Sequence, residues 1–170
     1  MRYVVAFIMF FVPISVFVSG CSTTPQKSRE ELAAENLEKA KLFLLENKSN
    51  PNIKETFSGL QYKVLKAGNG KRANRYSDVY VHFEGRLLGD VRPFDASDKN
   101  KPPVKVPLPA VIEGWREGIS LMNEGSTYMF FIPPQLAYGE KGSNPTKAKA
   151  VVGPNELLIY TITLVKVGSK

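Results

Sequence analysis

The sequence predicts an α+β domain in which a curled, mostly antiparallel sheet of about five strands wraps over one short helix. Short segments of alternating apolar and polar residues, separated by glycine and proline, fill most of residues 60–167. One short helix is expected among them, around Trp115, the only tryptophan in the 170 residues. A longer helix precedes the strands. A single short helix among antiparallel strands is best buried under a sheet that curls over it.

The first 20 residues have the layout of a lipoprotein signal peptide. Arg2 is their only charged residue, and residues 3–18 are uncharged and mainly apolar. The segment 18–21, Val-Ser-Gly-Cys, looks like the bacterial lipobox, in which Cys21 would be acylated. A transmembrane anchor is the alternative, because the apolar run lies near the lower limit of about 17 residues for a bilayer span. A lone cysteine can also be a buried, inert thiol, but Cys21 is followed by a polar linker and has no core to enter. This favours lipidation.

A helix of about twenty residues is expected after the linker. Ser28 and Glu31 fit a capping box, which places the helix start at Ser28. Pro51 places its end near residues 47–50. This helix has an apolar stripe that could pack on the chain's own domain; alternatively, the helix acts as a spacer. The stripe consists of Ala33, Leu37, Ala40 and Leu44, with Phe43 beside it. The expected organisation is thus a signal peptide at 1–20, a lipidated linker and helix at 21–50, and a globular domain at 51–170.

The strands are read from two-residue alternation. In the second of them, Val79, Val81 and Phe83 are expected on the inner face and His82 on the outer face. In the last strand, alternation puts Leu158, Tyr160, Ile162 and Leu164 on one face. The expected strand segments are 60–65, 79–84, 104–106, 126–132 and 157–167.

The short central helix is expected to begin near Pro109, since proline suits the first turn of a helix. In such a helix Val111 and Trp115 are four residues apart and share a face, with Ile112 beside them. A buried tryptophan then forms either part of the core or the floor of a pocket.

Several function classes find no support in the sequence. With 23 lysines and arginines against 16 acidic residues, the net charge is +7, but the cations are scattered, so no nucleic-acid partner is expected. His82 is the only histidine and has no cluster of metal ligands or triad partners in the sequence. The glycines at 68 and 70 lack the strand-to-helix context of a phosphate loop. We therefore expect no cofactor and no metal.

Five motifs in register carry a resemblance to a known family. They are Val81-His82-Phe83-Glu84-Gly85, Phe94-Asp95-Ala96-Ser97, Val111-Ile112-Glu113-Gly114-Trp115, Ala137-Tyr138-Gly139 and Pro154-Asn155-Glu156-Leu157. In order and spacing they resemble the FKBP family of peptidyl-prolyl isomerases, over about residues 57–167. The helix at 28–50 resembles the end of the helical region in bacterial members of the macrophage-infectivity-potentiator type. That region is much longer in those relatives and dimerises them, so dimerisation is not carried over to this chain.

The resemblance implies a role for each motif residue. Catalysis would fall to Asp95, Tyr138 and Trp115: the tryptophan as floor under the proline ring, the aspartate near the twisting amide, and the tyrosine hydroxyl as donor to a substrate carbonyl. The Ile112 backbone amide would be a second donor. The alternatives are a turn residue for Asp95 and a core residue for Tyr138. The implied substrate-binding residues are Phe83, Phe94, Val104, Val111, Ile112 and Tyr160.

The chain departs from the family pattern around the aspartate. Phe83 stands where a tyrosine hydroxyl usually bonds the carboxylate, and Asn100 stands where an arginine often pairs with it. Val104 replaces a phenylalanine, which enlarges the pocket, and Tyr160 adds a hydroxyl where phenylalanine is common. The apolar floor is retained, while the polar network is reduced.

The resemblance implies a prolyl isomerase that assists the folding of exported envelope proteins. Its partners would be proline-containing polypeptides, the lipid membrane through acylated Cys21, and macrolide inhibitors of the family as further ligands. Ser22, rather than aspartate, follows the cysteine, which favours the outer membrane, facing the periplasm, over the inner membrane. The alternative function is a proline-segment-binding chaperone or scaffold with little turnover.

Overall fold

The computed structural model describes residues 27–143 and 152–168. The predicted signal peptide at 1–20 and the predicted acylation site Cys21 lie outside these residues. Among the helices of the described ranges, none has the length and apolar character that crossing a membrane requires.

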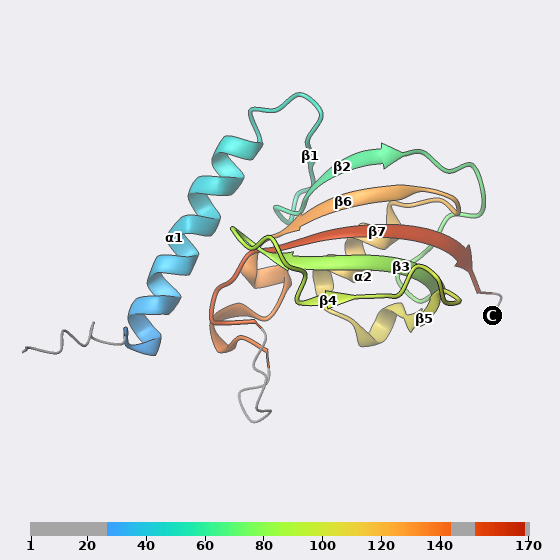
Figure 1. Ribbon diagram of the computed structural model, residues 1–170. Helices are drawn as coiled ribbons and strands as arrows, with labels where there is room; N and C mark the ends of the chain where they lie inside the picture. Colours follow the sequence, from blue (N-terminus) through green and yellow to red (C-terminus); the bar gives the residue numbers. More distant parts are fainter. Residues whose placement is uncertain (1–26, 144–151, 169–170) are drawn as a thin grey trace, which may run out of the picture.

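Seven antiparallel strands form one sheet in the described part of the chain (Figure 1). The strands follow the order β1-β2-β6-β7-β3-β4, and β5 also pairs with β3. The five predicted segments correspond to β2, β3, β5, β6 and β7. The other two have two residues each, too few to show an alternating pattern. The bounds are Lys54–Glu55 (β1), Gln61–Lys66 (β2), Asp78–Leu87 (β3), Asp95–Ala96 (β4), Val104–Pro107 (β5), Thr127–Ile132 (β6) and Leu158–Val167 (β7).

Alternation along the strands places one face of the sheet in the core, as predicted. Val79 and Val81 of β3 are fully buried, and so are Phe130 and Ile132 of β6. In β7 the whole expected set is buried, with exposed fractions of 3% or less: Leu158, Tyr160, Ile162 and Leu164.

The short helix α2, Glu113–Ser120, lies against this buried face (Figure 1). Two glycines one turn apart allow the close approach. A Cβ added at Gly114 would lie 2.4 Å from Ile132 Cγ2, and one added at Gly118 would lie 2.6 Å from Phe130 Cε1. The sheet therefore touches the helix backbone along this side, and the predicted α+β architecture is confirmed.

The helix starts four residues later than predicted. Residues Leu108–Ala110 form a 3₁₀ turn, η1, which contains Pro109. Val111 then returns to extended backbone, with φ −108° and ψ 171°, and Ile112 caps α2. Proline fixes φ at a value that suits a 3₁₀ turn as well as an α-helix, so the proline alone did not define the helix start. Val111 and Trp115 consequently do not share a helical face.

The long helix α1, Arg29–Asn47, begins as predicted. Ser28 Oγ accepts from the Glu31 N–H at 3.1 Å, and the Glu31 carboxylate accepts from the Ser28 N–H at 2.8 Å. The helix packs on its own domain, which settles the choice between packing and spacing. Its buried residues are Ala33, Asn36 and Ala40.

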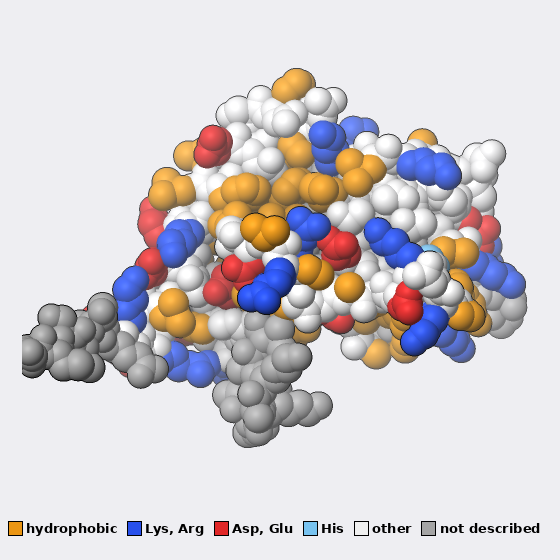
Figure 2. Space-filling model, viewed as in Figure 1, with side chains coloured by type: hydrophobic (Ala, Val, Ile, Leu, Met, Phe, Trp, Pro, Cys, Tyr) orange, Lys and Arg blue, Asp and Glu red, His pale blue; other side chains and the backbone are white. Residues whose placement is uncertain are grey.

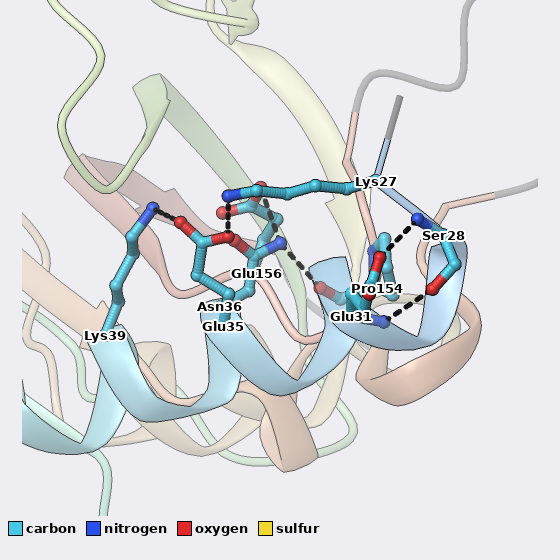
Figure 3. A network of polar contacts seen from close by, with 8 residues as sticks. All are labelled: Lys27, Ser28, Glu31, Glu35, Asn36, Lys39, Pro154 and Glu156. Carbon is cyan, nitrogen blue, oxygen red and sulfur yellow. Dashed lines mark hydrogen bonds and ion pairs between the residues drawn. The ribbon is translucent and has the colours of Figure 1, made fainter. Parts of the chain in front are cut away.

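The interface between α1 and the rest of the domain is apolar at one end and polar at the other. Hydrophobic side chains gather where α1 meets the sheet (Figure 2), and near the end of the helix the rings of Phe43 and Phe131 are 5.6 Å apart. Nearer its start, Asn36 extends toward Pro154 and Glu156 (Figure 3). The helix thus spans from the outer face of β6 to the loop before β7.

Candidate functional site

A pocket of about 360 Å³ opens between α2, the turn before it, and the concave face of the sheet. Trp115 and Tyr160 are 6% and 3% exposed and form its base, whereas Val104 and Tyr138 are 42% and 39% exposed and lie at its mouth. The lining residues are Phe83, Asp95, Val104, Val106, Ala110, Val111, Ile112, Trp115, Tyr138 and Tyr160.

Three aromatic rings meet at the base. The Trp115 ring lies 5.1 Å from Phe83 and 5.0 Å from Tyr160, both in edge-to-face geometry, with interplanar angles of 74° and 88°. Edge-to-face pairs at these distances are favourable beyond the area that they bury. The rings therefore brace one another and form a rigid apolar floor.

A glycine makes room for this floor. A Cβ at Gly85 in β3 would lie 2.4 Å from Tyr160 Cε1 and 2.6 Å from Tyr160 Cζ. The Tyr160 ring therefore lies directly on the backbone of the neighbouring strand. Any side chain at position 85 would push that ring toward the pocket.

Asp95 supplies the only carboxylate among the described residues that line the pocket. It lies in the short strand β4, whose partner is β3, through the register pairs Gly85 with Asp95 and Glu84 with Ala96. The side chain keeps access to solvent, yet the loss of surrounding water raises the pKa of Asp95, and the Ala96 backbone N–H offsets this only in part. No side chain of the described residues hydrogen-bonds the Asp95 carboxylate.

The absence of a side-chain partner follows from the two departures noted in the sequence. Phe83 lines the same pocket but has no hydroxyl. The Asn100 side chain makes no hydrogen bond to Asp95 among the described residues; its backbone N–H donates to the Asp98 carboxylate at 2.9 Å. The Asp95 carboxylate therefore lies at the pocket wall without a side-chain hydrogen bond from the described residues to orient it.

Two phenol groups share the pocket with Asp95. Burial is the main cause of the raised pKa of Tyr138, and the negative charge of Asp95 adds to it. The pKa of Tyr160 is raised in the same way, by burial first, then by Asp95 and Tyr138. Both phenols thus keep their protons at neutral pH and can donate hydrogen bonds into the pocket.

The backbone and the indole offer two more donors. The Ile112 N–H is used by no hydrogen bond among the described residues, since Ile112 caps α2 and only its carbonyl is engaged, by the Trp115 and Arg116 N–H groups at 3.0 and 3.1 Å. The buried Trp115 Nε1 also has no partner within the described ranges. An unsatisfied donor at the base of an apolar pocket is costly unless a ligand uses it.

The structure brings together eight of the nine residues that the sequence singled out. Phe94 is the exception: its ring packs edge-on against Tyr160 at 5.7 Å, and it is not among the residues that line the cavity. Sequence reasoning missed Val106 and Ala110. Alternation with Val104 could have found Val106, which lies two residues further along β5. Ala110 gave no signal, because its place depends on the 3₁₀ turn.

The described residues contain no cluster of three or more histidine, cysteine, aspartate or glutamate side chains that could hold a metal ion. His82 lies on the outer face of the sheet, as predicted, where its Nδ1 is 3.4 Å from the Ser97 hydroxyl. The described lining residues offer apolar surface, hydrogen-bond donors and one carboxylate.

Comparison with known proteins identifies the family. A family model described as "FKBP-type peptidyl-prolyl cis-trans isomerase" matches residues 69–165, more than half of the chain. The chain belongs to the FKBP family. A second model, "Domain amino terminal to FKBP-type peptidyl-prolyl isomerase", matches residues 14–64 and so includes α1. The predicted resemblance to the FKBP family is confirmed.

Several individual relatives of this FKBP chain come from bacteria. It is 44% identical over 135 residues to the peptidyl-prolyl cis-trans isomerase Mip of Coxiella burnetii, covering 79% of this chain and 56% of the relative. It is 41% identical to the outer membrane protein MIP of Legionella longbeachae, covering 79% and 55%. The crystal structure of FkpA from Escherichia coli superposes with a TM-score of 0.73 at 32% identity, covering 82% and 62%. The chain spans about half the length of the curated relatives that it matches.

Proposed function

We propose that this FKBP chain is a peptidyl-prolyl cis-trans isomerase that acts on proline-containing polypeptides without a cofactor. The observation that carries the proposal is the pocket itself, with a floor of mutually packed aromatic rings and two donors that no described residue uses. Its volume of about 360 Å³ is suited to a proline ring and its adjoining peptide bond. The names of the relatives support the same activity.

The reaction needs no nucleophile, because the barrier lies in amide resonance. Rotation about a peptide bond costs about 18–20 kcal/mol, and uncatalysed X-Pro exchange takes tens to hundreds of seconds. The planar amide is polar and well solvated, whereas the twisted amide is less so. A dry site that fits the twisted form therefore lowers the barrier. Lowering it by about 4 kcal/mol accelerates exchange roughly a thousandfold.

The pocket residues can divide this work among them. The Trp115 indole would hold the proline ring, with Val111 and Phe83 as walls. The Tyr138 hydroxyl at the mouth and the Ile112 N–H would fix the flanking carbonyls, so that rotation is confined to one bond. Asp95 would face the amide as it twists and its nitrogen becomes pyramidal and more basic.

A second candidate function is a proline-segment-binding chaperone or scaffold with little turnover. The observation in its favour is the lightly held Asp95, with no side-chain partner among the described residues. In this reading the aromatic floor binds proline, but the polar groups do not favour the twisted amide over the planar one. Equal binding of both forms gives affinity without rate.

An isomerisation assay on a series of short X-Pro peptides distinguishes the two. For the wild-type chain we expect faster cis-to-trans conversion. We expect Trp115→Leu and Tyr138→Phe each to lower kcat/KM by about tenfold or more while both remain folded. Lys66→Ala, at the exposed end of β2 and outside the pocket lining, is the control and should leave kcat/KM unchanged. A folded wild-type chain that binds the peptides but leaves their exchange rate unaltered would support the scaffold instead.

We also infer that the chain is held in the cell envelope by acylated Cys21, at the outer membrane facing the periplasm. The lipobox-like segment 18–21 and Ser22 support this. The name of the Legionella longbeachae relative, an outer membrane protein, agrees with it. Labelling cells with an alkyne fatty acid should mark the wild-type chain and leave Cys21→Ser unmarked. A chain that stays with the membrane fraction but takes up no label would favour the transmembrane anchor.

A further inference from the structure

One residue joins α1 to the turn that carries Tyr138. Asn155 is the only non-glycine residue of the described ranges with positive φ, at 52°. Its backbone N–H donates to the Gly139 carbonyl at 2.8 Å, and its side-chain Nδ2 donates to the Ala33 carbonyl of α1 at 3.1 Å. Gly139 directly follows Tyr138 in the chain. Asn155 therefore links the helix to the backbone next to a pocket residue.

Positive φ is unfavourable for a side chain other than glycine and is kept where the surroundings enforce it. Here two hydrogen bonds enforce it. Asparagine tolerates this conformation better than most residues and also supplies the amide donor that the Ala33 carbonyl accepts. An aspartate could adopt the same backbone but could not donate.

A second residue of α1 holds the same segment. Asn36, only 7% exposed, uses both hydrogens of its Nδ2: one donates to the Pro154 carbonyl at 2.9 Å and the other to Glu156 Oε1 at 3.1 Å. Figure 3 shows Asn36 extending from the helix toward these two partners. Residues on both sides of Asn155 are thus fastened to α1, which fixes Asn155 along the chain as well as at its own side chain.

A third contact from α1 reaches the turn directly. Residues Gly139–Lys141 form a 3₁₀ turn, η3, that Tyr138 caps. The Arg29 guanidinium donates to the Lys141 carbonyl at 2.6 Å. Gly139 has positive φ, at 57°, and no heavy atom lies within 4 Å of the Cβ that it lacks. With little packing on that side, the turn depends on these hydrogen bonds for its position.

We propose that α1 is a positioning element of the isomerase site, which fixes the Tyr138 turn through Asn155 and Asn36 and thereby the Tyr138 hydroxyl at the pocket mouth. This rests on the proposed function, because Tyr138 is assigned there as a donor to substrate. Small displacements of a positioned group reduce rate strongly. Loss of the α1 contacts should accordingly lower kcat/KM clearly, while the melting temperature changes little.

Three single variants of the full chain test the proposal in the X-Pro peptide assay. Asn155→Gly removes the bond to Ala33 but tolerates the positive φ, so its melting temperature should change little. Asn36→Ala removes the two neighbouring bonds. Asn47→Ala is the matched control. Asn47 Nδ2 donates to Gln61 Oε1 at 2.8 Å, so it too makes a hydrogen bond from an asparagine amide, but from the far end of α1 to β2.

We expect Asn155→Gly and Asn36→Ala to lower kcat/KM by about three- to tenfold, and Asn47→Ala to leave it within about twofold. In a Tyr138→Phe background, Asn155→Gly should have little further effect, since the group that it positions is gone. Wild-type turnover in Asn155→Gly and Asn36→Ala, or an equal loss in Asn47→Ala, would overturn the proposal.

A readout without turnover separates this proposal from the proposed function. In the chain labelled with fluorotyrosine, the ¹⁹F resonance of residue 138, assigned with Tyr138→Phe, should shift or broaden in Asn155→Gly and Asn36→Ala and stay in place in Asn47→Ala. If the wild-type chain shows no isomerase activity, the proposed function fails while this readout still decides the positioning. An unmoved resonance in all three variants would refute it.

Discussion

At the scale of single residues, the pocket group with the fewest contacts to hold it is the Asp95 carboxylate. Its pKa is raised by the loss of surrounding water, and no side chain of the described residues holds it. If the ionised carboxylate takes part in turnover, kcat/KM should fall on acidification through that raised pKa, and so at a pH above the ordinary value of 3.8. Asp95→Asn should remove this acid limb from the profile.

Phe83→Tyr tests Asp95 by giving its carboxylate a hydrogen-bond donor. A hydroxyl at position 83 can donate to the Asp95 carboxylate, which stabilises the charged form and lowers its pKa. We expect the acid limb of kcat/KM to move to lower pH, and kcat/KM at pH 7 to rise about two- to fivefold because the carboxylate is better oriented. The measurement is a pH profile of peptide isomerisation for both chains. An unchanged profile would mean that the hydroxyl does not reach Asp95.

Residue-scale sequence reasoning worked where the signal is local. The motif residues Trp115, Tyr138 and Asp95 line one pocket, as the family resemblance implied. Phe94 shows the limit. Its neighbour Asp95 lies in β4 and lines the cavity, whereas Phe94 precedes that strand and its ring packs edge-on against Tyr160.

At the scale of elements, the approach of α2 to the sheet depends on glycine. Gly118→Ala should destabilise the chain although alanine favours helix by about 1 kcal/mol, because its Cβ would lie 2.6 Å from the Phe130 ring. Overpacking of this kind costs about 1–3 kcal/mol. Chemical denaturation should show a net loss on the order of 1 kcal/mol.

Phe130→Leu provides the cross-check for that clash. If the ring is what Gly118→Ala strikes, the alanine should cost less in the Phe130→Leu background than in the wild type. Equal costs in both backgrounds would place the strain elsewhere in α2.

The joint between α1 and the loop before β7 has its own pH dependence. Burial raises the pKa of Glu156, nearby Asp90 adds to this, and Lys39 and Asn36 oppose it. A carboxyl whose pKa is raised on folding favours the fold while protonated, so this contribution is complete below the unfolded pKa of about 4.5 and is lost as pH rises through the folded value. Ionised Glu156 therefore weakens the joint at neutral pH.

Glu156→Gln should remove that loss and keep an acceptor for Asn36. We expect the melting temperature to rise by about 1–2 °C at pH 7.5 and the two chains to melt alike below about pH 4. Thermal melts followed by circular dichroism across this pH range provide the measurement. A variant that is less stable at pH 7.5 would show that the attraction to Lys39 outweighs burial.

At the scale of the whole molecule, the sequence predicted the architecture better than the contacts between its elements. Alternation in β3, β6 and β7 fixed which face is buried, and the capping box at Ser28 fixed the start of α1. The start of α2 was wrong, since Pro109 fits a 3₁₀ turn as readily as a helix. The partner of α1 stayed open, because the stripe on a helix says that it packs and leaves the surface unspecified.

Contacts between distant segments were beyond sequence reasoning. The positive φ of Asn155 and its link from Ala33 to Gly139 depend on loops that only the folded chain brings together. The same holds for Ala110 in the pocket wall. These long-range contacts join α1, the loop before β7 and the turn next to Tyr138.

Exchange NMR on an isotope-labelled X-Pro peptide tests the central claim most directly. With the wild-type chain present at a small fraction of the peptide concentration, the cis and trans proline resonances should exchange on the timescale of a second or faster, and Trp115→Leu should abolish most of this effect. Peptide resonances that report binding while cis and trans stay in slow exchange, as they do in free peptide, would contradict isomerisation and leave a proline-binding module.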